Sequence, residues 1–320
     1  MIKLINNVYY IPGFTNYIPG FTNVGVINAP VGNVNHLYII DSGRDPEDGE
    51  LLWAEFEKEF PETQGGFVIE AIVNTHGHGD HVGLNHYIQK KTNARIYISR
   101  VESSIINNPR QNVERIWGAD CIHQLSKLYT LKELFTATDI ISAGGEIYLD
   151  DGTILSFVDL EGHSPEQLGI LYHGKNGEKI LFTGDAYLGI DELEKVKISY
   201  QESPLTALET MKTLMTVEAD LFVQSHGQIE KNVQAAKSVI SKNIEALTNL
   251  VDYVKLLLEK KKRTIGEIVS KTFIHFRIAS KPVSYCLIYS TIKSLLSELY
   301  EAGQISFVIK KGRFYWEKVK

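Results

Sequence analysis

Residues 74 to 83 read NTHGHGDHVG, a stretch that contains three histidines and one aspartate within six consecutive positions. These four residues are His76, His78, Asp80 and His81. Imidazole nitrogens and carboxylate oxygens bind divalent metals, and a zinc ion usually takes about four such ligands. Gly77 and Gly79 lie between them and add no side chain that would crowd the cluster. The stretch therefore predicts a metal site, and its crowding suits a second ion beside the first.

The remaining ligands must come from elsewhere in the chain. Three later segments supply ligand-type residues next to glycine: EGHSPEQLG has His163, ILFTGDAY has Asp185 and LFVQSHGQ has His226. All three lie where a predicted strand ends. Tyr187, two residues after Asp185, is a candidate hydrogen-bond donor to a substrate oxygen, and a place in the core is equally consistent with the sequence. The other histidines have no motif partners, and we expect them to be surface or hydrogen-bonded residues: His36, His86, His123, His173 and His275.

In chain order, the segments HGHGDH, GHS, TGD and SHG resemble the metallo-β-lactamase superfamily over about residues 5 to 230. The resemblance implies an α/β fold, a four-layer αβ/βα sandwich with two metal ions at one edge between its sheets. It implies that one ion is held by three histidines and the second by an aspartate and two histidines, with one aspartate bridging both. By motif, the first ion would be held by His76, His78 and His163, and the second by Asp80, His81 and His226. The bridging aspartate would be Asp185. Zinc is the expected metal, and iron and manganese suit the same ligands.

Two cations that share a water lower its pKa toward neutrality, so a bridging hydroxide is the expected nucleophile. Asp80 is a candidate to orient that water or to carry a proton to the leaving group. The expected reaction is hydrolysis of an ester, thioester or lactone in a small molecule. Two alternatives are an endoribonuclease and an iron-dependent sulfur dioxygenase. The resemblance disfavours the β-lactam branches, which commonly differ at the position of Asp185, and the diiron flavoprotein reductases, which typically carry a glutamate where this chain has His78.

The elements that position these residues alternate along the first two hundred positions. Short β-branched runs such as HLYIID, FVIEAIVNT and RIYIS alternate with amphipathic stretches such as ELLWAEFEKEF. Turn residues within EIYLDDGTILSFVDL, and between LGILYH and KILFTGD, predict two hairpins. Residues from about 101 to 143 show no clear strand and predict a helical insertion. The expected organisation is a catalytic domain over 1–230, a linker helix over 231–262 and a small domain over 263–320.

The last domain has the order helix, helix, hairpin, which is typical of a winged-helix module. Lys311-Gly312 is the predicted hairpin turn. Residues 241 to 320 contain 15 lysines and arginines against 7 aspartates and glutamates, although the whole chain has a net charge of -6. Lys310, Lys311 and Arg313 on the hairpin are therefore candidate contacts to RNA, with a solvated charged turn as the default interpretation. A homodimer is left open.

Composition places the chain among ordinary globular proteins, since 43% of its residues are hydrophobic and 22% are charged. No apolar run approaches the roughly 18 residues of a membrane span, and MIKLINNVYYIPGF lacks the pattern of an export signal, so we expect a cytoplasmic protein without membrane contact. Cys121 and Cys286 predict neither a disulfide nor a thiolate metal site. The tandem repeat YIPGFTN at Tyr10–Asn16 and Tyr17–Asn23 predicts a surface loop after the first strand.

Overall fold

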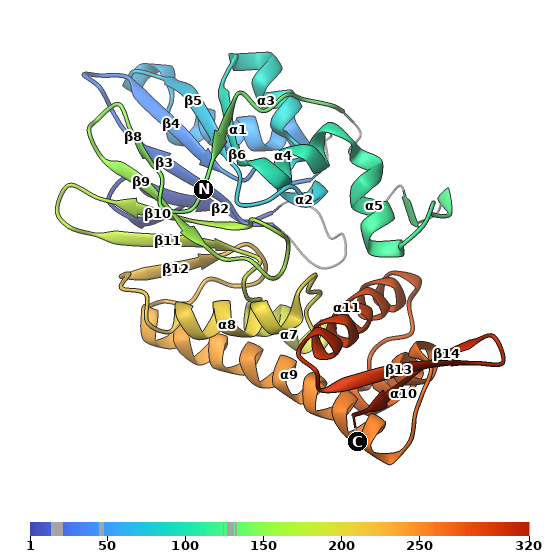
Figure 1. Ribbon diagram of the computed structural model, residues 1–320. Helices are drawn as coiled ribbons and strands as arrows, with labels where there is room; N and C mark the ends of the chain where they lie inside the picture. Colours follow the sequence, from blue (N-terminus) through green and yellow to red (C-terminus); the bar gives the residue numbers. More distant parts are fainter. Residues whose placement is uncertain (14–21, 45–47, 124, 127–130, 132, 320) are drawn as a thin grey trace.

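The computed structural model describes residues 1–13, 22–44, 48–123, 125–126, 131 and 133–319. Two β-sheets lie face to face, and helices cover the outer face of each sheet (Figure 1). These four layers are the αβ/βα sandwich that the sequence predicts. No helix within the described ranges combines the length and the apolar composition that crossing a membrane requires.

The first sheet has seven strands in the order of the chain. They are β1 (Ile2–Ile5), β2 (Val8–Ile11), β3 (Val24–Asn28), β4 (Asn35–Ile40), β5 (Phe67–Val73), β6 (Arg95–Ser99) and β7 (Asp139–Ile141). The first four pair antiparallel, and β4 to β7 pair parallel. The expectation of no strand between residues 101 and 143 is wrong, because β7 forms the edge of this sheet. With only three residues, β7 is too short to show an alternating pattern in the sequence.

The second sheet has five strands in the order β12-β11-β10-β9-β8. Their bounds are β8 (Glu146–Tyr148), β9 (Ile154–Asp159), β10 (Leu168–His173), β11 (Lys179–Gly184) and β12 (Leu221–Gln224). Both predicted hairpins are confirmed, since β8 pairs with β9 and β10 pairs with β11 in antiparallel fashion. The pairing of β11 with β12 is parallel. Residues that follow these two strands therefore leave the sheet at the same edge.

Alternation along each strand divides the side chains between two cores. In β4, Tyr38 and Ile40 point between the two sheets, whereas Leu37 and Ile39 point toward the helices. The helices over the first sheet are α1 (Gly49–Glu59), α3 (Asn85–Thr92) and α4 (Arg100–Asn107), each with a buried apolar side chain in that outer core. The short helices α2 (Gly79–Val82), η2 (Glu62–Gln64), α5 (Pro109–Trp117) and α7 (Ile190–Val196) lie in the connections.

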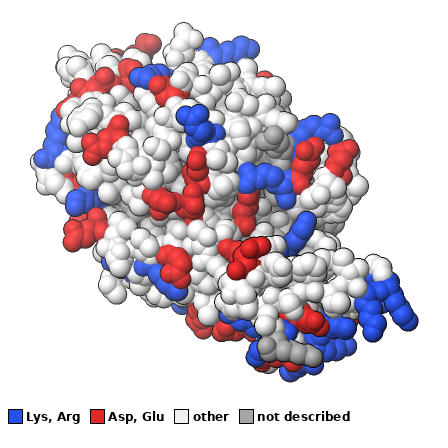
Figure 2. Space-filling view, viewed as in Figure 1, with Lys and Arg blue, Asp and Glu red and all other residues white. Residues whose placement is uncertain are grey.

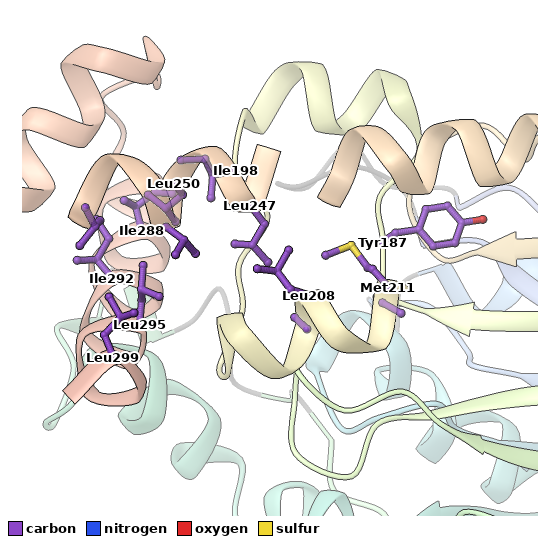
Figure 3. Close-up of a cluster of buried hydrophobic side chains, with 14 of the residues drawn as sticks. Tyr187, Ile198, Leu208, Met211, Leu247, Leu250, Ile288, Ile292, Leu295 and Leu299 are labelled. Carbon is purple, nitrogen blue, oxygen red and sulfur yellow. The ribbon is translucent and has the colours of Figure 1, made fainter. Parts of the chain in front are cut away.

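A third core joins the second sheet to the C-terminal part of the chain. It contains Leu208 of α8 (Pro204–Leu214), Leu247 of α9 (Val233–Lys260) and Leu295 of α11 (Pro282–Glu301), as Figure 3 shows. The predicted linker helix is therefore present as α9, and its buried side chains from Ala236 to Leu258 belong to this core along most of the helix. A continuous apolar core links the two predicted domains.

The C-terminal residues form α10 (Ile265–Phe276), α11, β13 (Ile305–Lys310) and β14 (Arg313–Lys318), in the expected order. Thr264 and Glu267 close a capping box at the start of α10. Arg263, between α9 and α10, makes an isolated antiparallel bridge with Trp316 of β14. Lys311 and Gly312 both have positive φ angles, as a two-residue hairpin turn requires.

The repeated YIPGFTN segment lies largely outside the described residues, because positions 14–21 fall in a gap. The first copy begins inside β2, which is the second strand rather than the first. The second copy ends at Thr22 and Asn23, and Thr22 forms an isolated bridge with His226. The end of the repeat is thus tied to the loop that follows the second sheet's β12.

Candidate metal centre

The HGHGDH loop follows β5 at the carboxyl end of the first sheet and leads into α2. Gly77 packs against Glu102 of α4, so that a Cβ atom on Gly77 would lie 2.9 Å from Oε2 of Glu102. Its N–H donates to that same oxygen at 2.8 Å. Burial raises the pKa of the Glu102 carboxyl to about 8. Glycine at position 77 thus lets a buried carboxyl group hold the backbone between two histidines.

The imidazoles of His76, His78 and His163 converge on one point. Nδ1 of His78 lies 2.9 Å from Nε2 of His76 and 2.9 Å from Nε2 of His163. Burial, together with the neighbouring histidines, lowers the pKa of His76 well below its usual value and that of His78 to about 3. Burial also lowers the pKa of His163. Three neutral imidazoles with nitrogens this close form a donor set suited to one cation.

The outer nitrogens of two of these rings have fixed acceptors. Nδ1 of His163 donates to the backbone carbonyl of Tyr200 at 3.0 Å. Nδ1 of His76 lies 3.0 Å from Oγ1 of Thr75, which itself donates to Asp41 at 2.8 Å and therefore accepts from the histidine. When Nδ1 carries the proton, the lone pair is on Nε2. Both rings thus present Nε2 as a lone-pair donor to the centre of the triplet.

Asp80, His81 and His226 form a second triplet, with ligand atoms within 4.8 Å of one another. Nε2 of His226 lies 3.3 Å from Oδ2 of Asp80, and Nε2 of His81 lies 3.9 Å from the same oxygen. Burial alone would lower the pKa of His226, but the carboxylates of Asp185 and Asp80 raise it to about 10. The same balance raises the pKa of His81. The carboxylates of Asp80 and Asp185 therefore favour the protonated forms of both imidazoles in this triplet.

Asp185 lies between the two triplets. Its Oδ2 is 3.4 Å from Nε2 of His163 and 3.2 Å from Nε2 of His226. Its Oδ1 is 3.4 Å from Nε2 of His81. Nearby histidines hold the pKa of this buried carboxyl well below its usual range, against the effect of burial. A single carboxylate therefore contacts histidines of both triplets, which is the arrangement expected of a group that spans two cations.

Asp41 is a residue beside the two triplets that the sequence reasoning missed. It follows β4 at the same sheet edge, is almost fully buried, and has a positive φ angle of 56°. Its Oδ2 accepts from Nδ1 of His81 at 2.8 Å and from Oγ1 of Thr75 at 2.8 Å. One carboxylate thus orients His81 directly and His76 through Thr75. The available signal was its place at the end of the run HLYIID, but no motif partner marked it.

Asn23, the last residue of the repeat, was also missed. Its side chain donates to the carbonyls of Gln224 and Gly227 at 3.0 and 2.9 Å, and its N–H donates to the carbonyl of Ser225 at 2.7 Å. These carbonyls lie on both sides of His226. The repeat therefore ends in a residue that holds the His226 loop in place.

The four remaining candidate residues belong to neither triplet. Tyr187 is 1% exposed within the third core, and its hydroxyl donates to Oε1 of Gln224 at 3.3 Å. This burial favours the core role over a contact to substrate, so the catalytic interpretation of Tyr187 is not supported. Lys310, Lys311 and Arg313 are exposed at the end of the β13–β14 hairpin, where Figure 2 shows a group of basic side chains.

Comparison with known proteins identifies a family that matches this chain. Residues 17–226 match the family model described as the metallo-beta-lactamase superfamily. The probable metallo-hydrolase YflN of Bacillus subtilis (strain 168) is 24% identical over 208 residues, which cover 59% of this chain and 74% of that protein. The atrochrysone carboxyl ACP thioesterase of Passalora fulva is 20% identical over 300 residues, covering 87% of this chain and 74% of that protein.

Solved structures share the fold at low sequence identity. A β-lactamase domain protein from Burkholderia ambifaria matches with a TM-score of 0.77 at 17% identity, covering 99% of this chain and 94% of that one. A metallo-β-lactamase family protein from Thermus thermophilus has a TM-score of 0.70 at 16% identity and coverages of 99% and 100%. The subclass B3 enzyme BJP-1 of Bradyrhizobium japonicum has a TM-score of 0.54 at 18% identity and covers 78% of this chain and 91% of its own. The first two likenesses include the C-terminal helices.

Proposed function

Because the chain belongs to the metallo-β-lactamase superfamily, a group of metal-dependent hydrolases, we propose that it hydrolyses an ester, thioester or lactone with two divalent ions. The observation that carries this proposal is the position of Asp185 in contact with histidines of both triplets. In this proposal His76, His78 and His163 would hold one ion, Asp80, His81 and His226 would hold the other, and Asp185 would be shared between them. Zinc is the proposed metal, since imidazole and carboxylate ligands suit it.

When bound, two such ions would lower the pKa of a shared water and polarise the scissile carbonyl. The protein's own residues supply the other requirements. Asp80 is the ligand residue with the most exposed side chain, at 26%, whereas the side chain of Asp185 is 7% exposed. We therefore assign to Asp80 the transfer of a proton from the attacking water to the leaving group. Glu102 and Asp41 hold the loop and the imidazoles in place, so no reorganisation is needed during the reaction.

Among the three carbonyl substrates, a thioester has additional support. The Passalora fulva relative is named a thioesterase, and its alignment spans most of this chain. At 20% identity this supports the reaction class and not the particular acyl carrier.

The proposal is tested by assaying purified protein, stripped with a chelator and then reloaded with zinc, on a panel of thioesters, simple esters, lactones and single-stranded RNA. We expect hydrolysis of a carbonyl substrate that depends on zinc and falls at least a hundredfold in Asp185→Asn. Asp252→Asn on the exposed face of α9 is the matched control and should behave as wild type. Zinc-independent activity, or full activity in Asp185→Asn, would contradict the proposal.

Hydrolysis of RNA is the second candidate, because one observation favours it. The basic end of the hairpin lies beside exposed Phe307 and Phe314, whose rings stack at 4.8 Å, and aromatic rings with basic groups bind single strands. The test is a triple alanine variant of Lys310, Lys311 and Arg313, with RNA affinity measured at low salt. Unchanged affinity removes this candidate.

Three expectations from the sequence are kept as proposals. Residues 263–320 are proposed to be a winged-helix-like module that follows the catalytic domain over 1–230 and the helix over 231–262. The second proposal is a cytoplasmic location, and the third is a homodimer.

A further inference from the structure

A pocket opens directly beside the candidate metal centre. His163 and Asp185 form part of its wall, so whatever occupies it lies next to the proposed reaction centre. The pocket has a cavity volume of about 60 Å³ and is open to solvent. It does not involve Asp80 or His226. The pocket therefore meets the centre at the three-histidine side.

The walls of this pocket are apolar. Beyond the two metal-centre residues, the described residues that line it are aliphatic or carry a hydroxyl group, and none is a lysine or arginine. Leu188 and Ile198 come from the segment around α7, and both are at most 5% exposed. A phosphate-rich ligand requires neutralising basic groups, which this wall lacks. An apolar chain gains free energy by leaving water for such a surface.

The C-terminal helices build the opposite wall. Ile278 lies between α10 and α11, and Val283, Leu287 and Ile288 lie on the first turns of α11. Ile288 also belongs to the third core together with Ile198, as Figure 3 shows. The same side chains thus anchor the C-terminal part to the catalytic part and close the pocket.

Polar contacts fix this wall relative to the metal centre. Oγ1 of Thr291, one turn beyond Ile288 on α11, accepts from the buried N–H of Gln201 at 3.1 Å. Tyr200, the residue before Gln201, lines the pocket, and its backbone carbonyl lies 3.0 Å from Nδ1 of His163. A displacement of α11 would therefore be transmitted to His163 through two consecutive residues.

We propose that the C-terminal helices form an acyl-chain pocket, and that the substrate is a thioester or ester with an unbranched apolar acyl group. This inference rests on the proposed hydrolytic function and names the substrate class of that same site. The scissile carbonyl lies at the metal centre, the acyl chain enters between Leu188 and Leu287, and the leaving group stays toward the side of Asp80. A bulky polar thiol carrier does not fit the aliphatic walls, which is why the acyl side occupies them.

The reaction that this placement serves is balanced by water alone. The oxygen of water forms a bond to the acyl carbon, the carbon–sulfur or carbon–oxygen bond breaks, and the leaving thiol or alcohol takes one proton. The products are a carboxylic acid and a free thiol or alcohol. No oxidant, reductant or second substrate is required.

The first test measures kcat/KM of the zinc-loaded protein on N-acetylcysteamine thioesters of acetyl, butanoyl, hexanoyl and octanoyl groups. We expect kcat/KM to rise about fourfold per methylene, which corresponds to about 0.8 kcal/mol, until the pocket is filled. Ser284→Phe places a ring in the pocket and should abolish the preference for longer chains. Ser297→Phe, on the exposed face of the same helix, is the matched control and should keep the wild-type profile.

A second readout does not depend on catalysis. Octanamide, a neutral compound that lacks a thioester, should bind the metal-free wild type and the Ser297→Phe variant in calorimetry, with at least tenfold weaker binding to Ser284→Phe. If Ser284→Phe does not fold, Leu287→Ala replaces it, and this larger pocket should move the preferred chain toward greater length.

The outcomes separate this inference from the proposed function. Equal kcat/KM for all chain lengths in the wild type, or a wild-type profile in Ser284→Phe, would overturn the acyl pocket and leave hydrolysis standing. Octanamide binding that Ser284→Phe removes, without hydrolysis of any thioester, ester or lactone, would retain the apolar pocket and overturn the proposed function. Absence of both binding and chain-length preference contradicts the pocket outright.

Discussion

Asp41 belongs to no motif, yet it is linked to both halves of the candidate centre, directly to His81 and through Thr75 to His76. Because its carboxylate accepts from His81 and from Thr75, which accepts from His76, one substitution should disturb both triplets. We expect Asp41→Asn to weaken zinc binding by about 10- to 100-fold, as is usual for the groups that orient metal-bound histidines. Competition with a chromophoric chelator measures this affinity, and Asp252→Asn is the control. Equal affinities in Asp41→Asn and wild type would contradict the assigned role.

The two triplets should also differ in how their metal affinity depends on pH. Without metal, the pKa of His226 is raised to about 10 and that of His81 is also raised, whereas those of His76, His78 and His163 are lowered. At pH 7 the raised pair carries protons that a cation must displace, and the lowered three do not. We therefore expect the zinc equivalent that binds beside His81 and His226 to release about two protons, and the one that binds at His76, His78 and His163 to release about none.

Calorimetry in buffers of different ionisation enthalpy counts these protons. In the metal-free protein, protonated His226 pairs with the carboxylates of Asp80 and Asp185. These pairs should stabilise the fold fully below pH 6.5, the usual pKa of a histidine, and their contribution should disappear as the pH rises through about 10. Equal proton release for both equivalents would show that the triplets do not differ in charge.

At this scale the sequence predicted the ligand-type residues and missed the residues that orient them. His76, His163 and Asp185 stand in short segments with glycine, and order in the chain was enough to find them. Asp41 and Glu102 act through contacts 25 or more residues away in the chain, as in the pairs Asp41–His81 and Glu102–Gly77. Such contacts depend on sheet pairing and helix packing, which one sequence does not specify.

At the scale of elements, the end of the repeated segment supports the loop after β12. Asn23→Ala would leave the carbonyls of Gln224 and Gly227 without their donor, at a cost of about 1–3 kcal/mol. We expect a lower melting temperature and weaker binding of the zinc ion that His226 is proposed to hold. Thermal unfolding and chelator competition measure both effects, with Asn33→Ala in an exposed turn as the control. A variant with wild-type stability and affinity would remove this role of the repeat.

Strands that read as short β-branched apolar runs were predictable, and strands without that signal were not. β4 and β5 were visible as the runs HLYIID and FVIEAIVNT, since both of their faces are buried, and the two hairpins had turn residues between their strands. β1 and β7 are short edge strands of four and three residues, and pairing with a neighbour stabilises them more than their own composition does.

At the scale of the whole molecule, the shared third core should make the two predicted domains unfold together. Leu208, Leu247 and Leu295 pack in one cluster across the proposed boundary, so loss of the C-terminal helices would expose apolar surface on α9. We expect a single transition in calorimetry, with equal van't Hoff and calorimetric enthalpies. Two separate transitions would mean that the C-terminal part is an independent domain.

The order of elements in the C-terminal part was predictable, but its position was not. Sequence periodicity indicated the helices and the hairpin, whereas their packing against the segment around Ile198 and Tyr200 follows from the three-dimensional arrangement. Charge made RNA contact one candidate role for this part, with a solvated charged turn as the default interpretation. Its contacts with the pocket wall favour a role in holding the substrate.

The central claim is that seven side chains hold two ions and that Asp185 bridges them. Elemental analysis of protein purified without added metal tests it most directly, with Asp185→Asn measured beside wild type and Asp252→Asn. The account predicts about two divalent ions per wild-type chain, most of them zinc, and about one or fewer in Asp185→Asn. Wild-type protein free of metal, or an Asp185→Asn variant with the full wild-type content, would contradict it.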